Sequence, residues 1–240
     1  MVLTRPSEKY FPFRTRGCFE YVNIPLTKTV PVSEIDSTMK EIQNYGPRYF
    51  VFTSTIGSDI FFSRYSHPDP EHVFIAIGSV TLNNIKNHGF DGLKPAIMDS
   101  SGLGRLIASV VKKGERVALL RSNRSTDELP EFLKSEGIDY REYIIYNIVE
   151  LNHNRLESYI LENNVFGIVV TSSMEAEILA RKCSESIKSR NIILFPIGTP
   201  TEKTLVSAGF DNIGLKGSSN IDNLIAGIEK KYCSNSGEWI

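Results

Sequence analysis

An internal repeat is the feature of this chain that most limits its fold. Residues 53–90 contain Thr-Ser, then Ile-Gly-x-x-Thr, then Gly-Phe, and residues 171–210 contain the same motifs in the same order. In both copies the threonine follows its glycine by three residues and precedes the next glycine by eight. An apolar run comes before each Thr-Ser and each Ile-Gly. Two copies of one strand–turn–helix pattern predict two similar α/β lobes with matching turns at a shared cleft.

The order of the other elements predicts parallel sheets. Short runs rich in Val, Ile, Phe or Tyr alternate with helical patterns, which is typical of parallel strands covered by helices. Strands are expected at 49–53, 73–77, 94–98, 116–121, 140–146, 1–4, 19–25, 166–171, 192–197 and 211–215. Helices are expected at 101–113, 127–136, 173–183, 200–208 and 219–231. We therefore predict an α/β fold of two similar lobes, each a parallel sheet flanked by helices, joined by a two-stranded hinge.

The strand order also predicts a discontinuous domain. Only two expected strands precede residue 32, too few for a domain. The economical solution is a lobe made of 1–27 and 150–240, with 33–145 inserted as the other lobe. The chain then crosses between the lobes at 28–32 and 146–149, and both crossings are apolar and β-branched enough to pair as a hinge. Strand 166–171 should share a sheet with strand 1–4.

Composition excludes several classes of protein. A formal net charge of −1 gives no global field that would recruit nucleic acid or an anionic membrane. No apolar stretch approaches the ~20 residues needed to cross a bilayer, and the first residues lack a signal-peptide pattern. The three cysteines, at 18, 183 and 233, are far apart and form no Cys-x-x-Cys. We therefore expect reduced thiols in a cytoplasmic protein.

The repeated turns are candidate anion sites. Thr53-Ser54 and Thr171-Ser172 each end a strand and open a helix, where hydroxyl residues are also ordinary N-caps. The functional alternative is that free backbone N–H groups, with the positive end of the helix dipole behind them, bind an anion. Ligands bind at the carboxyl ends of parallel strands. Two such turns at equivalent places in two lobes favour binding.

The Gly-x-x-Thr motifs repeat the same arrangement at the next strand. Gly78 and Gly198 permit close backbone approach, and Thr81 and Thr201 lie in the first helical turn, where a hydroxyl can be presented. No Gly-Lys-Ser/Thr follows either glycine, so neither is a Walker phosphate loop, and no Gly-x-Gly-x-x-Gly occurs.

Three single residues are further candidates. Arg121 ends an apolar strand and could grip a carboxylate with two hydrogen bonds, or be a solvated loop arginine. Arg5 follows the first strand, so it is expected at the cleft. Tyr146 ends the inserted lobe, where it could act as a weak acid or simply pack. The four histidines have no metal-ligand spacing, and no Ser-His-Asp or Cys-His arrangement stands out.

Taken together, these motifs resemble uroporphyrinogen-III synthases over nearly the whole chain. The resemblance rests on the order and spacing of Val2-Leu3-Thr4-Arg5-Pro6, Phe52-Thr53-Ser54, Ala76-Ile77-Gly78-x-x-Thr81, Arg116 to Arg121, Ile145-Tyr146, Val170-Thr171-Ser172 and Ile197-Gly198-x-x-Thr201. The family's two-lobed architecture agrees with the discontinuous domain predicted above.

The resemblance implies a lyase reaction: closure of hydroxymethylbilane, a linear tetrapyrrole, with inversion of the last pyrrole ring and loss of water. It implies no cofactor and no metal. Tyr146 matches the family's cleft tyrosine and would assist departure of the hydroxyl group, while Thr81 and Thr201 match threonines that look across the cleft. The substrate carries many carboxylates, which suits a cleft lined by Arg5, Arg121, helix N-termini and hydroxyls. A monomer that binds this small molecule alone is expected.

Two other classes of function stay open from the residues. One is a non-catalytic two-lobed binder of an anionic small molecule, which would bind without turnover. The other is an enzyme acting on a phosphorylated small molecule, which would place phosphate on the same helix N-termini.

Overall fold

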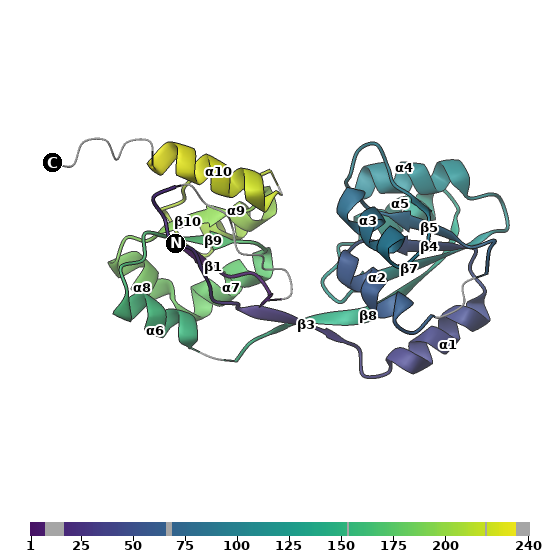
Figure 1. Ribbon diagram of the computed structural model, residues 1–240, viewed down its shortest axis with the longest axis horizontal. Coiled ribbons are helices and arrows are strands. Elements are labelled where there is room, and N and C mark those ends of the chain that lie inside the picture. The colour runs from purple at the N-terminus through teal and green to yellow at the C-terminus, as the bar shows by residue number, and fades with distance from the viewer. Residues whose placement is uncertain (8–16, 66–68, 153, 219, 234–240) are drawn as a thin grey trace. The chain divides into compact units, whose positions relative to one another are not determined.

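The computed structural model describes residues 1–7, 17–65, 69–152, 154–218 and 220–233. The chain forms two compact units: unit 1 comprises Met1–Thr29 with Val149–Ile240, and unit 2 comprises Val30–Ile148. Each unit is built on a sheet of mainly parallel strands with helices on its faces (Figure 1). The predicted α/β fold class is therefore confirmed. The predicted lobe boundaries differ from these unit boundaries by a few residues, and motion of the units as hinged lobes stays a prediction.

The sheet of unit 1 has the strand order β10-β9-β1-β2. Its strands are β1 (Val2–Leu3), β2 (Val22–Asn23), β9 (Gly167–Val170) and β10 (Ile193–Pro196), and all neighbours are parallel. Val2 lies opposite Ile168, so the predicted pairing of the first strand with strand 166–171 is confirmed.

The other sheet, which belongs mainly to unit 2 and is called its sheet below, has the order β3-β8-β7-β4-β5-β6. Its strands are β3 (Thr27–Pro31), β4 (Tyr49–Phe52), β5 (Val73–Ala76), β6 (Gly92–Leu93), β7 (Arg116–Ser122) and β8 (Asp139–Glu150). The pairs from β8 to β6 are parallel. In contrast, β3 runs antiparallel to β8, since Leu151 N–H donates to the Leu26 carbonyl at one end and Val32 N–H to the Ile145 carbonyl at the other.

Helices follow most strands. In unit 2 they are α1 (Ile35–Tyr45), α2 (Thr55–Phe62), α3 (Ser79–Asn87), α4 (Ser100–Val110) and α5 (Glu128–Ser135). In unit 1 they are α6 (Arg155–Glu162), α7 (Ser173–Lys182), α8 (Ser184–Ser189), α9 (Thr199–Ser207) and α10 (Ile221–Tyr232). Side chains of Ser54, Asp99, Ser172 and Asn220 cap α2, α4, α7 and α10. Within the described residues, no helix combines the length and apolarity needed to cross a membrane.

Alternation along the strands gives each sheet two apolar faces, as expected for parallel strands buried on both sides. In unit 1, Ile168 packs with α6 to α9, whereas its neighbour Val169 packs under α10. In unit 2, Phe50 and Phe52 pack with α1, α2 and α3, whereas Val51 packs with α4 and α5. The continuous apolar runs of the sequence are thus explained by burial on both faces.

Two predicted strands are wrong in detail. The strand expected at 94–98 is absent, and the sixth strand is Gly92–Leu93 instead. Pro95 has no N–H to donate to a ladder, which ends the pairing before the apolar Ile97 and Met98, and these are 58% and 56% exposed. At 211–215 the structure has only a bridge between Leu194 and Ile213.

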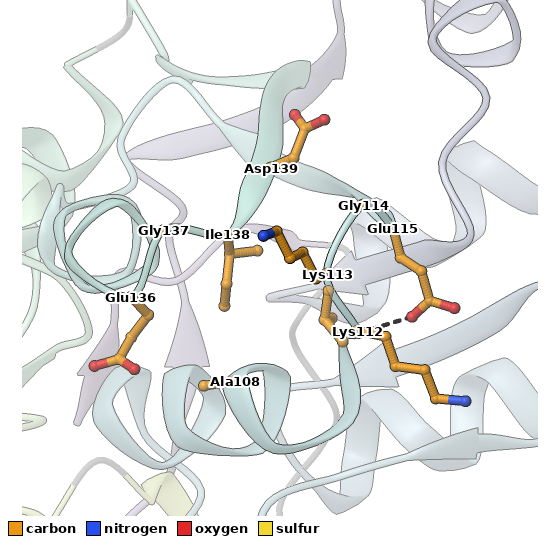
Figure 2. A pocket seen from close by; sticks show the side chains of 10 residues that line it. Ala108, Lys112, Lys113, Gly114, Glu115, Glu136, Gly137, Ile138 and Asp139 are labelled. Atoms are coloured by element: carbon orange, nitrogen blue, oxygen red, sulfur yellow. Dashed lines mark hydrogen bonds between the residues drawn. The ribbon is translucent and has the colours of Figure 1, made fainter.

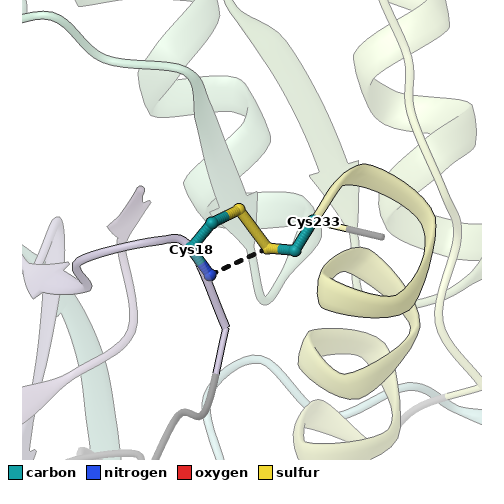
Figure 3. Close-up of a disulfide and its surroundings, with 2 residues drawn as sticks. All are labelled: Cys18 and Cys233. Carbon is teal, nitrogen blue, oxygen red and sulfur yellow. Dashed lines mark hydrogen bonds between the residues drawn. A yellow bond between two sulfur atoms is a disulfide. The ribbon is translucent and has the colours of Figure 1, made fainter. Parts of the chain in front are cut away.

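The expectation of reduced thiols is also wrong for two of the three cysteines. Cys18 and Cys233 form a disulfide across a sequence separation of 215, with their Cα atoms 5.5 Å apart (Figure 3). The physical reason is aromatic packing beside both cysteines. Phe19 and Tyr232 both contact the Phe166 ring, with centroids 4.7 and 5.4 Å away, so the end of α10 lies beside residues 18–19. Cys183 is a buried free thiol.

Candidate functional site

The turn from β4 to α2 carries a pair of hydroxyl groups. Ser54 caps α2, and its Oγ accepts a hydrogen bond from Gly57 N–H at 3.1 Å. The same Oγ lies 2.8 Å from the Tyr146 hydroxyl oxygen. Thr53, before the cap, is half-buried. Two of the residues predicted from the sequence, Ser54 and Tyr146, are therefore in direct contact at the carboxyl end of the unit 2 sheet.

An irregularity in the β7–β8 ladder places Tyr146 there. Arg121 pairs with Ile144, but the next residue, Ser122, pairs with Tyr146, so Ile145 is one extra residue in β8. Strict alternation would put Ile145 and Tyr146 on opposite faces. Both instead belong to the same core cluster, and they are 0% and 4% exposed. A bulge of this kind re-aims a side chain, and here it turns Tyr146 toward α2.

The turn from β5 to α3 brings Gly78 and Thr81 to the same end of this sheet. Gly78 precedes α3 in extended conformation, and Thr81, in the first turn of α3, is 5% exposed. The flexible Met98 side chain lies over this turn, with its Sδ 3.4 Å from both the N and Oγ of Ser79. The first N–H of α3 is thus covered by a thioether. A thioether is a weak hydrogen-bond acceptor, which a stronger acceptor such as a carboxylate can displace.

The turn from β9 to α7 in unit 1 has the same Thr-Ser sequence and different contacts. Ser172 caps α7 by accepting from Glu175 N–H at 3.2 Å. The Glu175 carboxylate, which is 1% exposed, reaches back to accept from Thr171 N–H at 2.8 Å and from Thr171 Oγ1 at 3.0 Å. Thr4 Oγ1 donates to it at 2.7 Å. This turn is therefore already filled by a carboxylate of the chain itself.

Sequence reasoning missed Glu175, although a signal was present. Ser172-x-x-Glu175 fits the capping-box pattern, in which a glutamate at the third helical position returns to the helix start. The equivalent position in the first repeat is Gly57, which has no side chain to fill the turn. The two Thr-Ser turns, which the repeat predicts to be equivalent, thus differ in what occupies them.

The turn from β10 to α9 matches the α3 turn. Gly198 precedes α9 in extended conformation, and Thr201 in the first turn is 3% exposed. Arg5 follows β1 in the same unit and is half-buried. Burial lowers the pKa of Arg5, and the nearby Glu175 and Asp222 oppose that shift. Its buried Nε has no hydrogen-bond partner among the described residues.

Arg121 is shielded from solvent, and its guanidinium group already has hydrogen-bond partners within the protein. Its side chain is buried, so the alternative of a solvated loop arginine is wrong. Nη1 donates to Glu142 Oε2 and Nη2 donates to the Thr126 carbonyl. These contacts clamp β7 to β8 and to the start of α5. To bind a substrate carboxylate, Arg121 would first have to leave both partners.

Two surface hollows lie at the other edge of the unit 2 sheet, before β7 and β8 begin. One, of about 360 Å³, is lined by Ala108, residues 111–115 and residues 136–139, and it carries lysines and carboxylates together (Figure 2). The other, of about 570 Å³, surrounds Tyr45, whose ring has the Arg116 and Arg141 guanidinium carbons 5.3 and 4.5 Å from its centroid. Neither hollow includes a residue predicted from the sequence to bind or react.

The family is decided by a match to known sequences. Residues 11–226 match the family model described as uroporphyrinogen-III synthase HemD. The chain belongs to the uroporphyrinogen-III synthase family. The resemblance stated from its motifs is thus confirmed.

A curated relative agrees with the family. The chain is 25% identical over 193 residues to the porphyrin biosynthesis protein HemD of Ruminiclostridium josui, which covers 74% of this chain. It spans only 38% of that curated relative's length.

Solved structures of the uroporphyrinogen-III synthase family share the fold. The Helicobacter pylori uroporphyrinogen-III synthetase superposes with a TM-score of 0.67 at 16% identity, covering 96% of this chain and 98% of that one. A mutant uroporphyrinogen III synthase from Thermus thermophilus gives a TM-score of 0.57 at 16% identity, covering 89% of each chain.

Proposed function

We propose that this chain closes hydroxymethylbilane to uroporphyrinogen III, with inversion of the last pyrrole ring and loss of water. Family membership supports the substrate, and the contact between Ser54 and Tyr146 carries the chemistry. The reaction breaks a C–O bond and releases water. Because the last ring is inverted, it also breaks the C–C bond that joined this ring to the chain of rings and forms two new C–C bonds. The pyrrole nitrogen drives the hydroxyl group out, so the protein need only assist its departure and hold one conformation of the chain of rings.

Tyr146 is the proposed acid. Its hydroxyl is within hydrogen-bond distance of Ser54 Oγ at the carboxyl end of the unit 2 sheet, where ligands of parallel sheets bind. A phenol there can donate a proton, or a strong hydrogen bond, to the departing hydroxyl group as it becomes water. A proton lost from the substrate when the ring closes restores the phenol, so the reaction is balanced without a cofactor.

Several other predicted residues would bind carboxylates of the substrate. In unit 2 these are Thr53, the Gly78 turn and Thr81, and in unit 1 they are Arg5, the Gly198 turn and Thr201. We propose that one substrate contacts both sets across an interlobe cleft. The Thr171-Ser172 turn already holds the Glu175 carboxylate. We therefore propose that this turn holds the neighbouring turns of unit 1 in place and does not itself bind a carboxylate of the substrate.

A single assay tests the proposal. Hydroxymethylbilane is supplied to the purified chain, and the product isomers are separated after oxidation to porphyrins. The expected product is isomer III, whereas spontaneous closure gives isomer I. Formation of isomer I alone, at the rate without protein, would overturn the proposal, and tight binding of the product under those conditions would favour a non-catalytic binder.

A further inference from the structure

We propose that Ser54 is a positioning residue for Tyr146: it donates to the phenolic oxygen, so that the Tyr146 proton is directed at the substrate. This inference rests on the proposed function and assigns Ser54 a task other than binding a carboxylate. Three features of the structure support it: the hydrogen-bond capacity of Ser54, the bulge in β8, and the glycine at position 57.

The hydrogen-bond capacity of Ser54 limits what its proton can do. A serine hydroxyl has one proton and two lone pairs. One lone pair accepts from Gly57 N–H at 3.1 Å, which fixes the hydroxyl against the first turn of α2. The proton and the second lone pair remain, and Tyr146 Oη is 2.8 Å away. Either oxygen can donate across this distance.

Only one of the two arrangements serves the reaction. If Tyr146 donates to Ser54, its proton is held inside the protein and is not available to a leaving hydroxyl group. If Ser54 donates to Tyr146, the phenolic proton is free to point at the substrate. As that proton moves, negative charge grows on the phenolic oxygen, and a hydrogen bond to a charged oxygen is stronger than one to a neutral oxygen. The start of α2, behind Ser54, adds its positive dipole end.

The bulge in β8 makes this contact possible. With the extra residue at Ile145, Ile145 and Tyr146 both pack into the cluster that contains α2. Without it, Tyr146 would follow the alternation of the strand and face the helices on the other side of the sheet. Ile145 alone would fill this part of the core. The register shift therefore has a second effect, which is to bring Tyr146 to the same face of the sheet as α2.

Gly57 keeps the space for the tyrosine open. A Cβ at position 57 would lie 3.3 Å from Ser54 Oγ and 3.6 Å from Tyr146 Cε1. A longer side chain at this place would compete for the turn, as Glu175 does at the equivalent position of α7. The Thr171-Ser172 turn thus holds the carboxylate of Glu175, whereas the Thr53-Ser54 turn is in contact with Tyr146.

The experiment is a double-mutant cycle on activity. Steady-state rates of isomer III formation are measured for the wild type, Ser54→Ala, Tyr146→Phe and the double variant. We expect Ser54→Ala to lower kcat by about tenfold with little change in KM. The double variant should be no slower than Tyr146→Phe alone, because Ser54 acts only through the phenolic oxygen. Multiplied losses in the double variant would overturn the proposal.

Two further variants separate positioning from helix capping. Ser54→Thr keeps a hydroxyl and a cap, so it should restore kcat to within about threefold of the wild type. Asn220→Ala removes a similar cap, the 2.9 Å bond from Asn223 N–H at the start of α10, where no tyrosine is involved. It should lower the melting temperature but keep kcat within about twofold. If Asn220→Ala slowed the reaction as much as Ser54→Ala, loss of a cap would explain both.

Failure of the proposed function gives a different result from failure of this inference. The same four proteins are therefore also compared by urea unfolding, whichever isomer the wild type makes. If the wild type makes only isomer I, a coupling between the two substitutions would show that the pair exists without catalysing this reaction. Additive losses of stability, together with a wild type that makes isomer III, would overturn the role of Ser54 and leave the function standing.

Discussion

Thr4 and Glu175 are joined by a buried hydrogen bond, in which Thr4 Oγ1 donates to Glu175 Oε2 at 2.7 Å. Thr4 follows β1, and Glu175 lies in the first turn of α7, so the bond ties residues 171 positions apart at one end of the unit 1 sheet. The carboxylate also accepts from Thr171 N–H and Thr171 Oγ1. Such a buried carboxylate is compatible with a stable fold only while each of these donors has an oxygen that accepts its hydrogen bond.

We therefore expect Glu175→Gln to destabilise the protein. The amide group turns an N–H₂ toward donors, and we expect a loss of about 2–4 kcal/mol in the free energy of unfolding. Urea unfolding followed by circular dichroism measures it. The control is Glu185→Gln, at an exposed position of α8, where the change should stay within about 0.5 kcal/mol. Equal effects of the two substitutions would contradict the role given to Glu175.

Binding of the substrate should be shared among several turns. Alanine at Thr81 or Thr201 should each lower the rate of isomer III formation roughly 10- to 100-fold, the effect of one or two hydrogen bonds to a charged group at ~1.5–3 kcal/mol each. Circular dichroism shows whether each variant keeps its fold. Complete loss of turnover in one folded variant would instead identify an indispensable residue.

Removal of the disulfide should destabilise unit 1. A cross-link between residues 215 positions apart restricts the unfolded chain strongly, and its loss is expected to cost about 2–5 kcal/mol. Cys18→Ser and treatment with dithiothreitol should therefore lower the melting temperature equally. Dithiothreitol should have no further effect on Cys18→Ser. A further drop in that variant would mean that reduction acts elsewhere.

The buried thiol of Cys183 should make stability depend on alkaline pH. Burial raises the pKa of Cys183 to about 11, and the nearby Glu157 adds to the shift. A pKa raised in the folded state means that the folded protein holds the proton more tightly. This contribution is present below the unfolded pKa of ~8.5 and is lost as pH rises toward 11. Between pH 8 and pH 10, the wild type should lose on the order of 2 kcal/mol more stability than Cys183→Ala. Parallel pH profiles of the two proteins would contradict this.

Much of the fold could be predicted because local chemistry and packing agree. Apolar runs such as Phe50-Val51-Phe52 are buried on both faces, and they lie where the alternation of strands and helices places them. The Thr-Ser and Gly-x-x-Thr motifs mark the turns because the backbone there needs caps and small residues. The prediction of a strand at 94–98 was wrong because it followed the apolar content of the segment and gave too little weight to Pro95, which cannot donate a hydrogen bond to a ladder.

The contacts that distinguish the two repeats could not be read from the repeated motifs alone. The extra residue at Ile145 leaves no trace in Ile144-Ile145-Tyr146, because its cause is the register against β7. The different occupants of the two Thr-Ser turns depend on one position, Gly57 or Glu175, outside the repeated letters. The disulfide depends on packing around Phe166, which brings together residues from both ends of the sequence.

The bond between Cys18 and Cys233 turns nearly the whole chain into a covalent ring. Unit 2, Val30–Ile148, lies entirely within that ring. A protease that cuts once in any loop between the two cysteines therefore opens the ring without releasing a fragment. The two pieces remain one molecule until a reductant acts, so a clipped sample keeps its full mass and shows its break only on a reducing gel.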